Sequence, residues 1–372
     1  MIYLDYSATT PVNKKVLETF DKVSLEFPGN PNSLHKLGLE SNKLIDAATS
    51  HIAQLLGVKK DEIIYTSGAT ESNNTAFYGV LNKYKERGKE IITTKLEHSS
   101  INSNLDYIKS LGYKVIYLKL NEDGKIDLED LKNKINNNTV LVSIASVNSE
   151  TGVRQDINEI GKIIKEYPRC IFHSDMTQSI GKVKENLRFV DLASFSAQKF
   201  YGLKGIGALI KKENIDLEPL IKGGKSTTIY RSGTPSPALI ASVSKALTLA
   251  YENIDKHYEY VKNLNNYLRE NIKNIDDIHI NSPENALPYI LNISVYGIKP
   301  ETLMHALEEK NIYISTRTAC SQDDYSKAVY ALTNNMEYAK TSLRISLSYL
   351  TTKEEIDEFI KAFKEIIKDL RF

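Results

Sequence analysis

Residues 194–202 read Ser194-Phe195-Ser196-Ala197-Gln198-Lys199-Phe200-Tyr201-Gly202, which places a lysine just after an apolar run and before a glycine-rich stretch. A lysine at the end of a buried strand loses much of its hydration, and this disfavours the charged ammonium. The neutral amine is also the form that condenses with a carbonyl group to give a Schiff base. Most lysines at strand ends are simply solvated, so the meaning of Lys199 depends on the motifs upstream of it.

Short runs of apolar, β-branched residues alternate with helical stretches between residues 62 and 210. The expected strands are 62–65, 91–94, 115–118, 140–145, 170–174, 191–196 and 207–210, and the expected helices are 71–87, 99–111, 128–135 and 157–167. This order favours an α/β fold with a mostly parallel, seven-stranded sheet covered on both faces. Ligands of such folds bind beyond the carboxyl ends of the strands. The polar residues expected there are Thr66, Glu97, His98, Asn148, Asp175 and Lys199.

After Pro235 the pattern changes to that of a smaller α+β unit. The elements expected in it are a long helical stretch over 238–272, a strand over 290–295, a helix over 301–310, an alternating strand over 343–348 and a last helix that begins with a Thr352–Glu355 capping box. A chain of 372 residues exceeds one typical domain. We therefore predict a large domain over 15–235 and a small domain formed by 1–14 and 236–372.

The composition is that of an ordinary soluble globular protein, with 41% hydrophobic and 26% charged residues. The net charge is +1 and no block of lysine or arginine is present, which argues against direct nucleic-acid binding. No apolar run approaches the length of a membrane span, and the first residues do not have the pattern of a signal peptide. Two cysteines cannot form a disulfide framework. We expect a cytoplasmic protein with no membrane association and no metal site.

The segment Ser67-Gly68-Ala69-Thr70 links an expected strand to an expected helix. Its backbone amides and hydroxyl groups could bind a phosphate at the helix N-terminus. It could equally be an ordinary strand–helix turn in which threonine caps the helix, because short motifs of this kind often occur by chance.

Two further residues have a functional and a structural interpretation. Asp175 follows an apolar strand, where its carboxylate would suit a protonated pyridine nitrogen, or it could cap a helix. His98 could stack on a flat ring and move protons, or it could be a hydrogen-bonded histidine at a strand end. Taken in this order with Lys199, these residues indicate a pyridoxal-phosphate site.

The motifs together resemble the cysteine desulfurases of the NifS/IscS type, in the class V aminotransferase family with the aspartate-aminotransferase-like fold. The resemblance extends over nearly the whole chain. It is carried by Tyr3–Pro11, Gly29–Pro31, Thr66–Asn73, Glu97–His98, Asp175–Gln178, Ser194–Gly202, Arg231–Thr234 and Arg344.

The resemblance implies a pyridoxal 5'-phosphate cofactor in a homodimer with shared active sites. Lys199 would form the Schiff base, with His98 on the ring, Asp175 at the pyridine nitrogen and Gln178 at the phenolic oxygen. The other cofactor contacts that it implies are Ala69, Thr70, Ser149, Ser196, Gln198 and, from the partner subunit, Thr234. Ser149 and Gln198 depart from the asparagine and histidine that are usual in the family. Arg344 would bind the substrate carboxylate, and Asn30 is the second expected substrate contact.

Cys320 lies in a polar loop without apolar periodicity, and Arg317 nearby would favour its thiolate. Cys170 instead begins an apolar strand, as a buried cysteine does. The resemblance implies that Cys320 is the nucleophile that takes sulfur from L-cysteine as a persulfide and leaves L-alanine. The sulfur would pass to an acceptor protein of tRNA thiolation or of iron–sulfur cluster assembly.

Two other classes of function stay open at this stage. The chain could be a selenocysteine lyase, another C–S lyase or an aminotransferase that uses the same cofactor. It could also be a sulfur-trafficking or scaffold subunit that kept the fold and lost the chemistry, although Lys199, His98, Asp175 and Arg344 argue against that.

Overall fold

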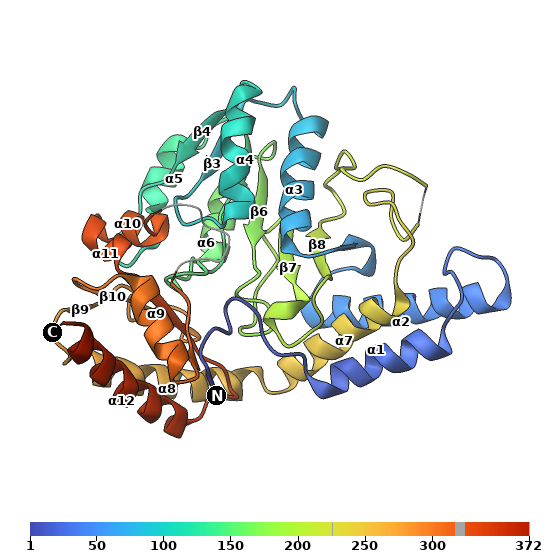
Figure 1. Cartoon of the computed structure of the whole chain (residues 1–372). Helices are drawn as coiled ribbons and strands as arrows, with labels where there is room; N and C mark the ends of the chain where they lie inside the picture. The colour runs from blue at the N-terminus through green and yellow to red at the C-terminus, as the bar shows by residue number, and fades with distance from the viewer. Residues whose placement is uncertain (225, 317–323, 372) are drawn as a thin grey trace.

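The computed structural model describes residues 1–224, 226–316 and 324–371. Its largest sheet has seven strands in the order β2-β8-β7-β6-β5-β3-β4 (Figure 1). They are β2 (Ile63–Thr66), β3 (Glu90–Thr93), β4 (Lys114–Tyr117), β5 (Thr139–Ser143), β6 (Ile171–Asp175), β7 (Leu192–Ser196) and β8 (Gly207–Lys211). Strand β8 is antiparallel to both of its neighbours, and the other pairs are parallel. The predicted mostly parallel, seven-stranded sheet is confirmed.

Helices cover both faces of this sheet, which explains why its central strands are apolar almost throughout. Leu141 packs into the core on the side of α3 (Ala69–Lys83) and α4 (Ser99–Ser110). The next residue, Val142, points to the opposite core, which includes side chains of α6 (Ile157–Ile164). The shorter α5 (Leu128–Lys134) contributes Leu131 to that same core.

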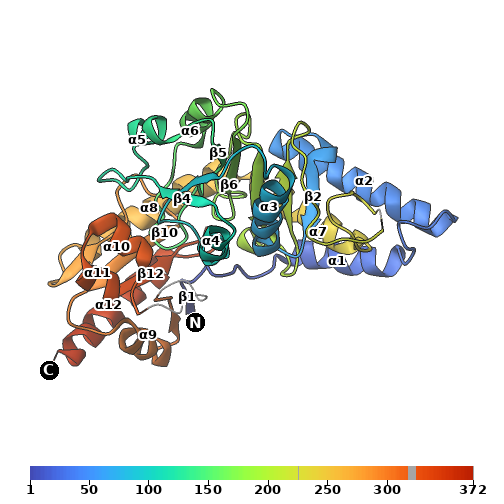
Figure 2. The same ribbon diagram turned by 90° about the horizontal axis from the view of Figure 1, so that it is seen from above.

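Two helices that the sequence analysis did not identify, α1 (Lys14–Glu26) and α2 (Lys36–Leu56), extend to one side of the large sheet together with α7 (Pro237–Glu252) (Figure 2). The helical stretch predicted over 238–272 is present, but it is divided into two helices, because the chain breaks at Asn253 and continues as α8 (Ile254–Ile272). Asn253 has φ −128° and ψ 20°, outside the helical region, and asparagine favours such breaks. Most of the buried apolar side chains of α7 belong to the core of the large sheet. The domain division stays a prediction, and this packing favours a boundary between α7 and α8.

The C-terminal part contains a second, antiparallel sheet of three strands. Strand β10 (Ile290–Val295) lies between β9 (Ile278–Ile280) and β12 (Ser342–Ser346). Its core is completed by α8, α9 (Pro300–Glu309) and α12 (Lys353–Leu370), and the last of these starts with the predicted capping box. Short helices α10 (Lys327–Thr333) and α11 (Met336–Lys340) precede β12.

The N-terminus joins this C-terminal part before it reaches the large sheet. Strand β1 (Ile2–Tyr3) pairs in parallel with β11 (Ile312–Tyr313), and Asp5 bridges to Ser346 at the end of β12. The N-terminal segment 5–8, which follows β1, therefore runs between the two sheets and toward the strand ends of the larger one. No helix among the described residues has both the length and the apolar character needed to cross a membrane.

Candidate active site

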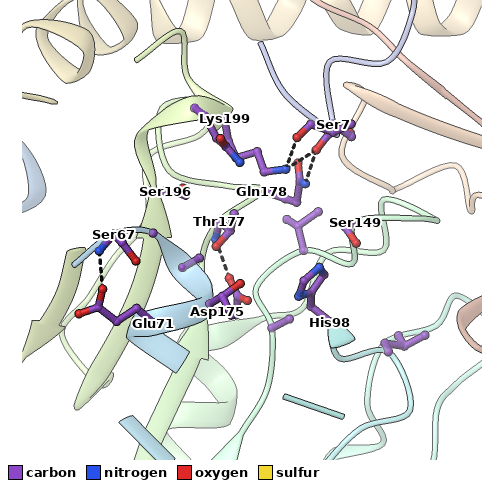
Figure 3. A pocket seen from close by; sticks show the side chains of 18 of the residues that line it. Ser7, Ser67, Glu71, His98, Ser149, Asp175, Thr177, Gln178, Ser196 and Lys199 are labelled. Carbon is purple, nitrogen blue, oxygen red and sulfur yellow. Dashed lines mark hydrogen bonds between the residues drawn. The ribbon is translucent and has the colours of Figure 1, made fainter. Parts of the chain in front are cut away.

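A cavity of about 320 Å³ lies at the carboxyl ends of β6 and β7, between the large sheet and the N-terminal segment (Figure 3). The predicted site residues that line it are Ala69, Thr70, His98, Ser149, Asp175, Gln178, Ser196, Gln198, Lys199 and Arg344. Thr234 and Asn30 are exposed and do not line it. Cys320 and Arg317 lie outside the described residues. The sequence thus identified most of the wall, although its residues come from positions far apart in the chain.

Lys199 ends a short 3₁₀ helix (Ala197–Lys199) that directly follows β7. Its amine donates hydrogen bonds to the carbonyl oxygens of Ser7 and Ala8, at 2.7 and 2.6 Å. Figure 3 shows its side chain reaching toward Ser7 across the cavity. Backbone carbonyls carry no residue-type signal, and for that reason the sequence analysis missed this contact.

Asp175 is the last residue of β6, and both of its carboxylate oxygens accept hydrogen bonds. Oδ1 accepts from the backbone N–H of Thr177 at 2.9 Å, and Oδ2 accepts from Nδ2 of Asn73 at 2.7 Å. The chain after Asp175 forms turns rather than a helix, so the helix-cap interpretation of this residue is wrong. A buried carboxylate that accepts two such bonds is well placed to face a cation in the cavity.

His98 caps the N-terminus of α4 with its ring. Nδ1 accepts a hydrogen bond from the backbone N–H of Ser100 at 3.1 Å and lies 2.9 Å from Oγ of the same serine. Burial lowers the pKa of His98, because the charged ring would lose hydration. The ring is therefore neutral at neutral pH and faces the cavity with its other edge (Figure 3).

The N-terminus of α3 opens onto the cavity. Its N-cap is Gly68, which has φ +154° and provides no side-chain cap, so the interpretation of Thr70 as the cap is wrong. A Cβ atom at Gly207 would lie 2.8 Å from Cα of Gly68, so this close approach of β8 to the turn needs glycine. The first N–H groups of a helix lack partners within the helix and attract anions. This end of the cavity suits a phosphate.

Arg344 projects from β12 and is only 2% exposed. Nη1 donates to the backbone oxygen of Ser149 at 3.0 Å, and Nη2 donates to Oδ1 of Asp5 at 2.8 Å. Nε is buried and has no hydrogen-bond partner among the described residues. An unpaired buried donor is unfavourable, so this N–H suits the oxygen of a bound anion.

Two buried titratable residues lie beside the site. The sequence analysis placed Glu97 at a strand end without a role, and it did not identify Lys182. Burial raises the pKa of Glu97 to about 8, although its Oε1 accepts hydrogen bonds from Thr94 and from the backbone of Ala145. Burial, together with the charges of Lys199 and Arg344, lowers the pKa of Lys182 to about 7. Lys182 donates to Oε1 of Gln178 at 2.8 Å, behind the cavity wall.

The donors and acceptors of the cavity fit pyridoxal phosphate. An amine, a paired carboxylate and an open helix N-terminus line one space, as the aldehyde, the ring nitrogen and the phosphate of that molecule require. The profile of the aminotransferase class-V family matches residues 2–359. The chain belongs to the class-V aminotransferase family. Members of this family depend on pyridoxal phosphate.

The relatives found by sequence cover almost the whole chain. A protein named NifS/IcsS protein homolog from Lactobacillus delbrueckii subsp. bulgaricus is 42% identical over 98% of this chain and 97% of its own. A protein named cysteine desulfurase IscS from Dictyoglomus turgidum is 39% identical over 100% of this chain and 95% of its own.

Solved structures that resemble this chain also cover almost all of it. A NifS-like protein superposes with a TM-score of 0.93 at 34% identity, over 99% of both chains. The structure described as SspA in complex with cysteine superposes with a TM-score of 0.82 at 31% identity, over 95% of this chain and 100% of that one.

Proposed function

We propose that the protein is a pyridoxal-phosphate-dependent cysteine desulfurase, a sulfurtransferase that converts L-cysteine to L-alanine and transfers the sulfur to Cys320. The observation that carries this proposal is one cavity that Lys199, Asp175 and the guanidinium-bearing Arg344 line together. An amine and a carboxylate suit the cofactor, and a buried guanidinium N–H suits the carboxylate of an amino acid. The named relatives support sulfur chemistry among the reactions of the family.

Different residues of the cavity would contact different parts of the cofactor. Asp175 would face the ring nitrogen, His98 the ring face and Gln178 the phenolic oxygen. The phosphate would lie at the N-terminus of α3, and the residues proposed to hold it are Ala69, Thr70, Ser196 and Gln198, with Ser149 near the ring. When bound, pyridoxal phosphate supplies an electron sink for the charge that develops at the substrate's α carbon.

Arg344 would hold the substrate by its carboxylate. Asp5 and the backbone of Ser149 fix two of the guanidinium nitrogens, which keeps the planar group from turning when the substrate enters. The remaining Nε–H would donate to a carboxylate oxygen and form a charge-assisted hydrogen bond. Asn30 remains a proposed second contact, which would have to come from a different arrangement of its exposed loop or from another subunit.

Cys320 would perform the sulfur transfer. Its thiolate attacks the sulfur of the bound L-cysteine, an S–S bond forms, and the C–S bond breaks with its electron pair left on carbon. That carbon takes up a proton and leaves as alanine, so Cys320 keeps the sulfur as a persulfide. Arg317 would support the thiolate by its charge.

We also propose a partner subunit, a sulfur acceptor and a cellular compartment for this site. Thr234 is exposed, which suits a residue that reaches the phosphate of the partner subunit in a homodimer. The persulfide would be passed to an acceptor protein of tRNA thiolation or of iron–sulfur assembly. A reducing compartment such as the cytoplasm keeps such a cysteine free to react.

The test measures alanine released from L-cysteine in the presence of a thiol acceptor. Wild-type protein should release alanine, and Cys320→Ser should lose this activity while the yellow cofactor stays bound. Cys170→Ala is the matched control, because Cys170 is buried and burial raises the pKa of its thiol, which should leave it unreactive. Equal alanine from wild type and Cys320→Ser would overturn the proposed role of Cys320 and indicate a lyase that eliminates sulfur directly.

A further inference from the structure

A chain of hydrogen bonds connects Asp175 to His98 through two residues that lie behind the cavity wall. Asn73, on α3, donates from Nδ2 to Oδ2 of Asp175 at 2.7 Å and to Oγ of Ser100 at 2.8 Å. Oγ of Ser100, on α4, lies 2.9 Å from Nδ1 of His98. Asn73 is 0% exposed, and neither Asn73 nor Ser100 lines the cavity.

The direction of the first link follows from the carboxylate. An ionised Asp175 can only accept hydrogen bonds, and its other oxygen already accepts from the backbone of Thr177. The amide of Asn73 must therefore present nitrogen rather than oxygen to it. One hydrogen on Nδ2 is then donated to Asp175 and the other to Ser100. The opposite orientation would place the amide oxygen against a carboxylate oxygen. The amide oxygen of Asn73 is buried without a partner among the described residues, which is the energetic cost of this arrangement.

The direction of the second link follows from the first. Because Oγ of Ser100 accepts from Asn73, its own hydrogen is free to be donated to Nδ1 of His98. The backbone N–H of Ser100 also donates to Nδ1. A ring nitrogen that accepts hydrogen bonds carries no hydrogen, so the single proton of the neutral imidazole must be on Nε2.

We propose that Asn73 and Ser100 are positioning residues that hold His98 in the tautomer with hydrogen on Nε2, so that this N–H faces the cavity. The assignment of the tautomer stands on the hydrogen bonds alone. Its consequence for catalysis rests on the proposed function. A neutral His98 in this tautomer offers a donor to the cavity and cannot accept a proton there, because Nδ1 is covered by Ser100. The first proton taken from the substrate would then go to another base, for which the amine of Lys199 is the candidate.

The test reads the tautomer directly by NMR in protein that carries ¹⁵N-labelled histidine. The chain has seven histidines, and the His98 signals are assigned by their loss in His98→Gln. Both cofactor-loaded and cofactor-free wild type should show Nδ1 at the shift of an unprotonated ring nitrogen and Nε2 at that of an N–H. A wild-type spectrum with hydrogen on Nδ1, or with both nitrogens at one averaged shift, would overturn the assignment.

Variants distinguish the effect of the Asn73 and Ser100 side chains on the tautomer from that of the backbone N–H of Ser100. Ser100→Ala removes the hydroxyl and should give a mixture of tautomers, whereas Ser100→Thr keeps a hydroxyl and should retain the wild-type spectrum. Ser99→Ala is the matched control on the same helix. Asn73→Leu should shift the signals in the same direction as Ser100→Ala. If both variants keep the wild-type spectrum, the backbone N–H of Ser100 alone sets the tautomer and the proposed role of the two side chains is overturned.

Kinetics supply the second measurement. With the catalytic role as proposed, Ser100→Ala lowers kcat for alanine release by between about three- and tenfold, as expected for one hydrogen bond, and leaves KM nearly unchanged. A larger rise in KM than fall in kcat would contradict the role in the chemical step. A desulfurase assay that fails for wild type would leave the NMR result standing, so the two proposals fail separately.

Discussion

The two sides of the cavity differ in the polar atom that each leaves without a partner among the described residues, which is the amide oxygen of Asn73 on one side and Nε of Arg344 on the other. On one side, the carboxylate wall (Asp175, Asn73, Ser100 and His98) is a chain of donors and acceptors whose order is set by the carboxylate. On the other, the cation wall (Lys182, Lys199 and Arg344) brings three basic side chains together, and its Arg344 has an N–H without a partner among the described residues.

This difference suggests that the carboxylate wall orients the reacting groups, whereas the cation wall binds the anionic groups of the ligand. The carboxylate wall is pre-organised, so its geometry should change little when a ligand enters. In the cation wall Arg344 is already paired with Asp5, but the charges of Lys199 and Arg344 still lower the pKa of Lys182, and an anion would relieve this repulsion. Ligands that carry phosphate or carboxylate should therefore stabilise the cation wall, whereas substitutions in the carboxylate wall should change the reaction more than binding.

The largest expected effect comes from removing the charge of Arg344. Arg344→Gln should lower kcat/KM for L-cysteine about 100-fold, because a buried charge-assisted hydrogen bond to the carboxylate is lost. Cysteamine lacks a carboxylate, so its far lower rate should be unaffected by the substitution. Steady-state kinetics with both compounds measure this. If the variant discriminated between cysteine and cysteamine as wild type does, Arg344 would not bind the substrate carboxylate.

Glu97, beside the carboxylate wall, should make stability depend on pH. Its pKa is raised to about 8 from 4.5, so the native state holds a proton that the unfolded state has lost between these values. The contribution of Glu97 to stability is therefore complete below about pH 4.5 and decreases as pH rises toward 8, by at most about 1.4 kcal/mol per pH unit. Glu97→Gln mimics the protonated acid and should flatten this slope in urea unfolding between pH 5 and 8. An unchanged slope would show that Glu97 ionises normally.

Lys182, on the cation wall, should give the opposite slope. Its pKa is lowered to about 7 from 10.5, so the unfolded state binds a proton that the native state lacks between these values. Stability should rise with pH in that window, because the cost of burying the charge is full below about pH 7 and fades above it. Lys182→Met removes this dependence. The free energy of unfolding of wild type should therefore rise relative to that of the variant between pH 7 and 9. Lys256→Met, on the exposed side of α8, is the control. Parallel curves for wild type and Lys182→Met would contradict the lowered pKa.

The sequence predicted the sheet and most cavity residues because both leave local signals. Apolar runs mark buried strands, and Lys199 or Asp175 directly follow such runs. It could not predict the hydrogen bonds of Lys199 to Ser7 and Ala8, since these use backbone oxygens at a separation of 192 and 191 residues. The same holds for Asn73, which lies within a quoted motif but is assigned a role only once α3 and β6 are placed side by side.

Helix boundaries show the same limit at a smaller scale. The apolar spacing over 238–272 continues through Asn253, so periodicity alone predicts one helix, and only packing against two different cores separates α7 from α8. Helices α1 and α2 lie between motifs that the sequence analysis singled out, and neither contains one of the chemical residues that guided it.

The smallest expected effect tests whether the cation wall and the N-terminus of α3 bind anions without the rest of the cofactor. Inorganic phosphate at about ten times its dissociation constant should stabilise the cofactor-free protein by about 1.4 kcal/mol, a rise of a few degrees in Tm against chloride of equal ionic strength. Thr70→Val should reduce this rise if phosphate lies at the N-terminus of α3, whereas Arg344→Gln should reduce it if phosphate lies at the cation wall. Thr75→Val, a buried threonine on the same helix that does not line the cavity, is the control. A rise that survives both of the first two substitutions would place the anion outside this cavity. The proposed contrast between a carboxylate wall that orients and a cation wall that binds anions would then be wrong.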